Sequence, residues 1–269
     1  MIHAVVRTLL ALGVLWHAVR PGVWQAEVDM ASEGPLSVVR AVAIRLDPTY
    51  LRFNLDRANR DEGVRGAWTI DRIPADAVVA FNAGQFTGGW PWGWLVHDGV
   101  ESQEPGTGTL GMAFVVDSAG GVSLVTQDEL PAMRTRARTA FQSYPALLIG
   151  EGEQPRELQA PGRGVDLKHR DSRLALGILE DGSVVVAITR FTALGDAGET
   201  LPWGPTVGEM AEFMRSLGCR RAMLLDGGLS SQLALRGEDG ELKRWKNWRA
   251  VPLGLVVTPV SVTSERNVR

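Results

Sequence analysis

Cysteine and histidine are scarce in this 269-residue sequence, which has one cysteine, Cys219, and four histidines. A single cysteine excludes an intramolecular disulfide and a metal site built from several thiolates. Metal-dependent phosphodiesterases cluster their His and Asp ligands, whereas the histidines here are scattered at positions 3, 17, 97 and 169. We therefore expect no metal site and no bound cofactor, although the sequence does not exclude a divalent cation.

An excess of positive charge is also absent. The chain has 28 Lys and Arg against 31 Asp and Glu, a net charge of -3 and a pI near 5.9. Proteins that bind nucleic acid usually carry a basic stripe that neutralises phosphates. The sequence shows no such stripe, so we expect no nucleic-acid partner.

Hydrophobic runs long enough to cross a membrane are absent near the N-terminus. Thr8 to Val19 is apolar except at Thr8 and His17 and follows Arg7, which matches the hydrophobic part of a signal peptide better than a membrane span. We predict that residues 1–21 are a signal peptide or anchor. This predicts a periplasmic or extracellular location, with membrane or envelope association through the N-terminus. A buried N-terminal helix of a cytoplasmic protein is the alternative, because no clear cleavage site follows.

Strand and turn signals dominate the rest of the chain. Residues 38–46 and 78–82 are short runs of apolar and β-branched residues, which are typical of strands. Hairpin turns are expected where residues that tolerate positive φ separate two apolar runs, at Ser118 to Gly121, Asp181 to Gly182 and Glu238 to Gly240. The pattern predicts an α+β fold: a largely antiparallel or mixed β-sheet core with a few packed helices. We expect a single domain over residues 22–262 and a tail over 263–269.

One helix is strongly indicated after residue 205. Thr206 and Glu209 have the spacing of a capping box, and Gly218 is a natural C-terminal cap. Apolar residues recur at helical spacing between them, at Val207, Met210, Ala211, Met214 and Leu217. A second, weaker helix is predicted over Asp128 to Thr139.

An aspartate ends the apolar run MLLDGGLSS, Met223 to Ser231. Asp226 is followed by Gly227 and Gly228, so one interpretation is a tight turn whose carboxylate accepts backbone hydrogen bonds. The other is an active-site carboxylate held at the end of a strand, with Ser230 close by.

The stretch FNAGQFTGGWPWGW, residues 81–94, combines an amide, four glycines and three tryptophans. Glycines allow close backbone approach, and exposed indole rings stack on the C–H faces of sugars. Asn82, Gly84, Trp90 and Trp92 are therefore candidate sugar contacts. The alternative is that the tryptophans anchor a hairpin in the core.

Two more polar groups precede apolar strands. Gln142 and Ser143 stand at a corner, where such side chains often only satisfy loop backbone groups. In KHRDSRLALGI, His169 and Arg173 lie ahead of a strand, and a guanidinium is well suited to hold a phosphate. A solvated basic turn is the alternative.

These stretches, in this order, make the chain resemble the phosphodiester glycosidase family. They are VVAFNAGQF, GGWPWGWLVHDGV, AFQSYPALLIGEG, HRDSRLALGILEDGSVVVAIT and TVGEMAEFMRSLGCRRAMLLDGGLSSQL, and the resemblance covers about Gly22 to Val260. Residues that match the motifs are Asn82, Gly84, Pro91, Gly93, Gln142, Ser143, Pro145, Arg173, Gly177, Asp226, Gly227, Gly228 and Ser230. Ala83, Gln85, Tyr144, Leu174 and Leu229 depart from the motifs, and such changes would narrow the pocket or change the substrate.

The resemblance implies a hydrolase that cleaves the glycosidic bond of a sugar-1-phosphodiester and releases free sugar and a phosphomonoester. The transition state of this reaction resembles an oxocarbenium ion. Asp226 would act at C1 as nucleophile or as base, and Arg173 and Asn82 would bind the phosphate or sugar oxygens. The partner is then a glycan or sugar phosphate, contacted by Gly84, Trp90, Trp92, Gln142, Ser143, His169, Gly227, Gly228 and Ser230, with His169 also a candidate proton donor.

Two other functions stay open at this point. The first is a non-catalytic carbohydrate-binding envelope protein that keeps the pocket without turnover. The second is a metal-dependent phosphodiesterase that breaks a P–O bond, with Asp226 as a ligand. Free sugar as product would indicate the glycosidase, and a sugar phosphate would indicate the phosphodiesterase.

Overall fold

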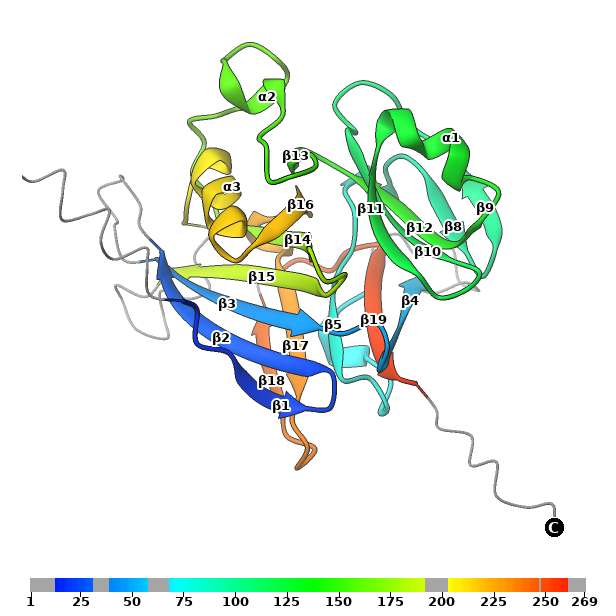
Figure 1. The fold of residues 1–269 in the computed structure, drawn as a ribbon, viewed down its shortest axis with the longest axis vertical. Coiled ribbons are helices and arrows are strands. Elements are labelled where there is room, and N and C mark those ends of the chain that lie inside the picture. Colours follow the sequence, from blue (N-terminus) through cyan, green and yellow to red (C-terminus); the bar gives the residue numbers. More distant parts are fainter. Residues whose placement is uncertain (1–12, 31–38, 58–67, 192–202, 247, 261–269) are drawn as a thin grey trace, which may run out of the picture.

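Antiparallel β-sheets make up most of the protein (Figure 1). The computed structural model describes residues 13–30, 39–57, 68–191, 203–246 and 248–260. Every strand pair within these ranges is antiparallel. The predicted antiparallel core is therefore confirmed in a single folded domain, with less helix than an α+β fold usually has.

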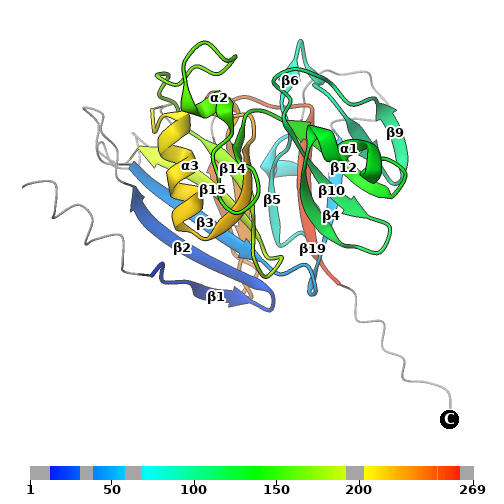
Figure 2. The ribbon, with the colours of Figure 1, turned by 45° about the horizontal axis from the view of Figure 1, so that its top comes forward.

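The largest sheet has seven strands, and helix α3 (Val207–Ser216) packs on one of its faces (Figures 1 and 2). The predicted capping box is present, because Thr206 Oγ1 accepts from Glu209 N at 3.2 Å and Thr206 N donates to Glu209 Oε2 at 2.8 Å. The buried methionines of α3 share a core with the sheet. In spatial order the strands are β1 (His17–Arg20), β2 (Val23–Met30), β3 (Val39–Leu46), β15 (Val184–Phe191), β14 (Leu174–Leu179), β16 (Cys219–Leu224) and β13 (Ala146–Leu148).

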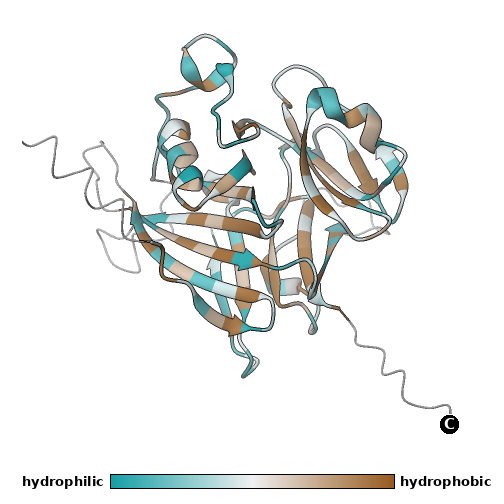
Figure 3. Cartoon of the chain, in the orientation of Figure 1, coloured by the Kyte–Doolittle hydropathy of each residue, from teal (hydrophilic) through white to brown (hydrophobic). Residues whose placement is uncertain are grey.

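A second sheet of five strands lies against the first. Its residues Phe81, Leu233 and Leu255 join Ile44 and Val186 of the first sheet in one buried cluster. Apolar residues run along the strands of the sheets in Figure 3. In spatial order the second sheet contains β18 (Leu242–Lys246), β17 (Gln232–Arg236), β5 (Val79–Asn82), β19 (Leu253–Pro259) and β4 (Leu51–Arg57).

A third sheet of five strands lies on the opposite side of β5 and β19 from α3, in both views of the ribbon (Figures 1 and 2). Phe114 and Phe141 of this sheet reach the shared core. Its spatial order is β11 (Val122–Thr126), β10 (Met112–Asp117), β12 (Ala137–Ser143), β8 (Leu95–His97) and β9 (Val100–Gln103), and a separate hairpin is formed by β6 (Phe86–Thr87) and β7 (Trp90–Pro91).

The predicted turns are confirmed, whereas the second predicted helix is wrong over much of its length. The three hairpins connect β10 to β11, β14 to β15 and β17 to β18. Within Asp128 to Thr139, helix α1 covers only Leu130–Met133, and β12 begins at Ala137 because it pairs with both β10 and β8. The other helical elements in the described part of the chain are short: α2 (Arg156–Gln159) and the 3₁₀ turns Ile70–Arg72, Gln127–Glu129 and Gly228–Ser230.

Part of the predicted N-terminal segment belongs to the folded sheet. His17–Arg20 form β1, which pairs with β2, so the sheet begins a few residues before the predicted boundary at residue 22. Residues 1–12 and the predicted tail lie outside the described residues, and their assignments stay predictions. None of the helices that the structure describes has the length and hydropathy needed to span a bilayer.

An ion pair joins the 3₁₀ turn that follows β11 to the seven-stranded sheet and makes stability depend on pH. Arg221 donates to the two carboxylate oxygens of Glu129 at 2.6 and 2.9 Å, and these hydrogen bonds lower the pKa of Glu129 to about 2. A lowered pKa stabilises the folded state above the unfolded value, and the contribution is lost as pH falls through the folded value. Because the pair is partly exposed, we expect Glu129→Gln to lower the free energy of unfolding at neutral pH by about 1 kcal/mol.

Urea denaturation at several pH values checks this expectation. The difference between the Glu129→Gln variant and the wild type should shrink as pH falls from 4.5 towards about 2. Glu212→Gln is the matched control, since Glu212 forms an exposed pair with Arg215 within α3 and should contribute less than about 0.5 kcal/mol. A difference that does not vary with pH would contradict the role of the Glu129 charge.

Candidate active site

The backbone of Asp226 is clamped by the loop that follows β5. Asp226 N donates to Gly84 O at 3.0 Å, and Asp226 O accepts from Asn82 Nδ2 at 2.8 Å. Asn82 is buried and its Oδ1 also accepts from Gln232 N at 2.8 Å. Gly84 has a φ of 68°, a conformation that favours glycine. The Asn-x-Gly and Asp-Gly-Gly stretches therefore meet, as the sequence predicted, and together fix the position of Asp226.

The two glycines after Asp226 are required by close contact with the segment before β14. A Cβ on Gly227 would lie 2.6 Å from Ser172 O, and one on Gly228 would lie 2.6 Å from Asp171 Oδ2. Gly228 also has a φ of 56°, and its N–H donates to Ser172 O at 2.8 Å. Any side chain here would push the two segments apart. The glycines thus bring a second carboxylate, Asp171, against the turn.

Asp171 is a functional candidate that the sequence analysis did not single out. Its Oδ1 accepts from Ser172 N at 2.8 Å, and its Oδ2 lies 3.5 Å from His169 Nε2. Burial raises the pKa of Asp171, and the charge of Arg173 opposes that rise. The available signal was an aspartate just ahead of an apolar strand, between two arginines. Its contact with Gly228, which the sequence does not report, distinguishes it from an ordinary surface residue.

The carboxyl group of Asp226, like that of Asp171, has a raised pKa. Burial raises the pKa of its carboxyl group, and the nearby charge of Asp171 raises it further. A hydrogen bond from Ser230 and the charge of Arg249 act in the opposite direction. Two carboxyl groups that interact and both have raised pKa values are a recognised sign of a catalytic site.

Arg173 interacts with the charge of Asp171, and two of its five guanidinium N–H groups hold loops. Its Nε donates to Pro205 O at 3.2 Å and its Nη2 donates to His169 O at 2.6 Å. Burial lowers the pKa of Arg173, and the charges of Asp171 and Asp166 oppose this. Among the described residues Nη1 has no hydrogen-bond partner, so it can bind a ligand oxygen, as can the second N–H of Nη2.

Gln142 and Ser143 make the hydrogen bonds expected of side chains that satisfy loop backbone groups, the alternative to a ligand contact. The buried Gln142 side chain accepts from Trp94 N and Gly106 N, both at 2.7 Å, and donates to Gly106 O and Leu110 O. Ser143 Oγ, also buried, donates to the backbone oxygen of Leu224, two residues before Asp226. These side chains support the loops around the site, and the structure does not present them to a ligand. Buried Asn82 likewise positions Asp226.

The tryptophans of residues 81–94 divide between the surface and the core. Trp90 and Trp92 are 53% and 40% exposed, and Trp94 is buried. The Trp92 ring lies 6.2 Å from the Tyr144 ring, and Tyr144 is close enough to Arg173 to interact with its charge. Tyr144 therefore lies between Trp92, which its ring contacts, and Arg173, with whose charge it interacts. For Trp94, the core interpretation is correct.

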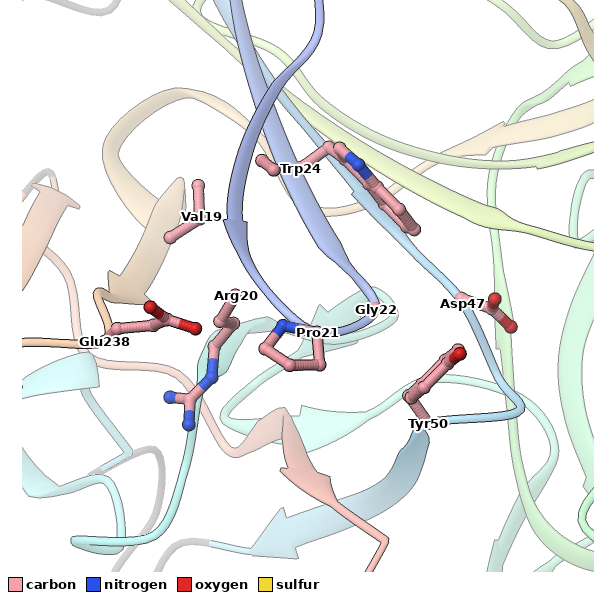
Figure 4. Close-up of a pocket in the computed structure, with 9 residues that line it drawn as sticks. Val19, Arg20, Pro21, Gly22, Trp24, Asp47, Tyr50 and Glu238 are labelled. Carbon is pink, nitrogen blue, oxygen red and sulfur yellow. The ribbon is translucent and has the colours of Figure 1, made fainter.

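A hollow at the β1–β2 turn is separate from these residues. It has a volume of about 630 Å³ and is lined by Trp24, Asp47, Tyr50 and Glu238 among others (Figure 4). None of the predicted site residues lines it. In the described ranges, no three His, Cys, Asp or Glu side chains are grouped in a way that could hold a metal ion.

Comparison with known proteins identifies a family and the fold. The family model described as phosphodiester glycosidase matches residues 75–258. The catalytic domain of zebrafish N-acetylglucosamine-1-phosphodiester alpha-N-acetylglucosaminidase, auto-inhibited by its pro-peptide, has a similar structure, with a TM-score of 0.66 and 17% identity over 91% of this chain and 86% of that chain. No curated protein matches the sequence significantly.

Two further solved structures share the fold. A hypothetical protein from Synechocystis has a TM-score of 0.61 and 16% identity, over 93% of this chain and 64% of that one. A protein from Burkholderia pseudomallei K96243, described as a candidate exported protein, has a TM-score of 0.51 and 15% identity, over 82% of this chain and 74% of that chain. At these identities the similarity establishes the fold.

Proposed function

Because the chain belongs to the phosphodiester glycosidase family, we propose that it hydrolyses the glycosidic bond of a sugar-1-phosphodiester and releases free sugar and a phosphomonoester. The observation that carries this proposal is the carboxyl pair Asp171 and Asp226, brought together by the two glycines and bordered by Arg173. Glycosidases of most families use two such carboxyl groups.

Charge develops at two positions in the proposed reaction, and the protein must stabilise it at both. When the bond between C1 and the phosphate oxygen breaks, its electron pair goes to the phosphate, and C1 becomes positively charged. The phosphomonoester is a good leaving group, so a cation near its oxygens is more useful than full protonation. The free Nη1 of Arg173 supplies this charge in our proposal.

The two carboxyl groups take different parts in the proposed reaction. Asp226, fixed through its backbone by Asn82 and Gly84, acts at C1 as nucleophile or as the base that activates water. Asp171 and the exposed His169 beside it carry protons between the site and solvent. Water provides the new oxygen on C1. Trp92, which is exposed and contacts Tyr144, stacks on the sugar or its aglycone.

We also propose that the protein works outside the cytoplasm and without a bound metal. The hydrophobic run of residues 8–19 and the similarity to a protein described as a candidate exported protein support export. Fractionation of cells that produce the full chain tests this, and recovery of the uncleaved chain in the cytosol would contradict it. Turnover measured with and without EDTA tests whether the reaction requires a metal.

Turnover of UDP-GlcNAc and a small panel of other sugar-1-phosphodiesters tests the function. We expect free sugar and an intact phosphomonoester by mass spectrometry, with and without EDTA. A sugar phosphate as product, or loss of turnover in EDTA, would favour metal-dependent cleavage of the P–O bond. Binding without any product would favour the carbohydrate-binding protein.

A further inference from the structure

The backbone of a second arginine, Arg249, is fixed beside the glycine turn, and its charge lowers the pKa of Asp226. Arg249 N donates to Leu229 O at 2.9 Å, and Arg249 O accepts from Gln232 Nε2 at 3.0 Å. Gln232 is buried, and its backbone N–H donates to Asn82, which also binds Asp226. Two buried amides therefore tie the backbones of Arg249 and Asp226 to the same sheet.

Four charged residues follow one another across the site. The Arg249 backbone is hydrogen-bonded to Leu229, and Gly228, the residue before Leu229, lies against Asp171. On the other side of Asp171, the Arg173 side chain is hydrogen-bonded to Pro205 and His169. Burial raises the pKa of both aspartates, the Arg249 charge lowers that of Asp226, and the Arg173 charge lowers that of Asp171. The two carboxyl groups are thus in the middle, with one guanidinium at each end.

The Arg249 guanidinium has more unused hydrogen-bond donors than the Arg173 guanidinium. The Arg249 side chain is exposed and makes no hydrogen bond or ion pair with any residue that the structure describes, so its whole fork of donors is available. Beside it, Trp248 is 72% exposed. An exposed indole on the residue that precedes a free guanidinium in the chain suits a ring that carries an anionic group.

We propose that Arg249 and Trp248 form a subsite for an acidic sugar, in which Arg249 binds a carboxylate of the sugar and Trp248 stacks on its ring. This inference rests on the proposed function, because the phosphate is taken to lie at the Arg173 end and C1 at the carboxyl pair. The sugar then extends towards Arg249. A carboxylate accepts two parallel hydrogen bonds from a guanidinium, which neutral sugars cannot do.

A pair of substrates that differ only at C6 tests the subsite. UDP-glucuronic acid has a carboxylate where UDP-glucose has a hydroxymethyl group. We expect wild-type kcat/KM to favour the uronate by about tenfold, and Arg249→Gln to bring the ratio close to one. Arg244→Gln is the matched control, since Arg244 pairs with Asp71 elsewhere on the surface, and it should retain both the ratio and the activity.

The outcomes separate this inference from the function on which it rests. A wild-type ratio near one, a ratio that survives Arg249→Gln, or an equal loss on both substrates would overturn the acidic-sugar subsite while leaving the glycosidase intact. Equilibrium binding to the Asp226→Asn variant, measured by calorimetry, removes the need for turnover. About tenfold tighter binding of the uronate, lost on adding Arg249→Gln, would support the subsite even if the wild type hydrolysed neither compound. Absence of binding by both would overturn it.

Discussion

Asp226→Asn is expected to lower kcat on a sugar-1-phosphodiester by about 10³–10⁴-fold. The amide keeps the shape of the side chain and can still accept the hydrogen bond from Ser230, but it can neither attack C1 nor take a proton from water. The variant's turnover is measured on the best substrate of the panel. Asp181→Asn is the matched control, because Asp181 is also an aspartate at the end of a strand, in the β14–β15 turn with Arg45, and should retain turnover.

The same substitution should not destabilise the fold at neutral pH. Burial raises the pKa of Asp226 in the folded state, so the folded state favours the protonated form. The favourable contribution is present below the unfolded value of about 3.9 and is lost as pH rises through the folded pKa. Asp226→Asn avoids that loss, so its free energy of unfolding near pH 7 should equal or exceed that of the wild type.

Two outcomes would contradict this account of Asp226. Turnover within about tenfold of the wild type would make Asp226 a structural residue of the turn. A large decrease in stability near pH 7 would mean that the ionised carboxylate holds the loops together, and the loss of activity would then have another explanation.

Gln142→Ala is expected to lower the free energy of unfolding by about 3–5 kcal/mol, because it removes hydrogen bonds from several backbone groups of Trp94, Gly106 and Leu110 at once. Urea denaturation measures the change. Gln154→Ala is the matched control, since Gln154 is only half-buried and its side chain makes an exposed hydrogen bond to Glu212; a change below about 0.5 kcal/mol is expected there.

Kinetics distinguish the supporting role of Gln142 from the ligand contact predicted from the sequence. A variant that keeps wild-type stability and raises only KM would favour the ligand contact. A variant that loses stability and whose residual activity falls as the fraction of folded protein falls would favour the supporting role.

Features that depend on neighbouring residues were predicted well from the sequence. The capping box of α3 and the turn at Asp181 and Gly182 are local, because the residues that form them are adjacent or one turn apart. The predicted helix over Asp128 to Thr139 failed for the opposite reason. Pairing of β12 with strands on both sides outweighs the local preference of its residues.

The candidate site was predicted only in part, because its composition depends on which loops meet. The motifs correctly brought Asn82 and Gly84 to Asp226. They could not show that Gln142 is fully occupied by backbone groups. Asp171 and Arg249 become visible only through contacts with Gly228 and Leu229, and no spacing in the sequence reports those contacts.

Hydrolysis in H₂¹⁸O tests the central claim most directly, because it shows which bond breaks. The protein is incubated with the best sugar-1-phosphodiester of the panel, and both products are analysed by mass spectrometry. Cleavage between C1 and oxygen puts ¹⁸O into the free sugar and leaves the phosphomonoester unlabelled, and this is the result we predict, with the label absent in Asp226→Asn. Label in the phosphate would mean that a P–O bond is broken, and it would contradict the assignment of Asp171, Asp226 and Arg173 to glycoside hydrolysis.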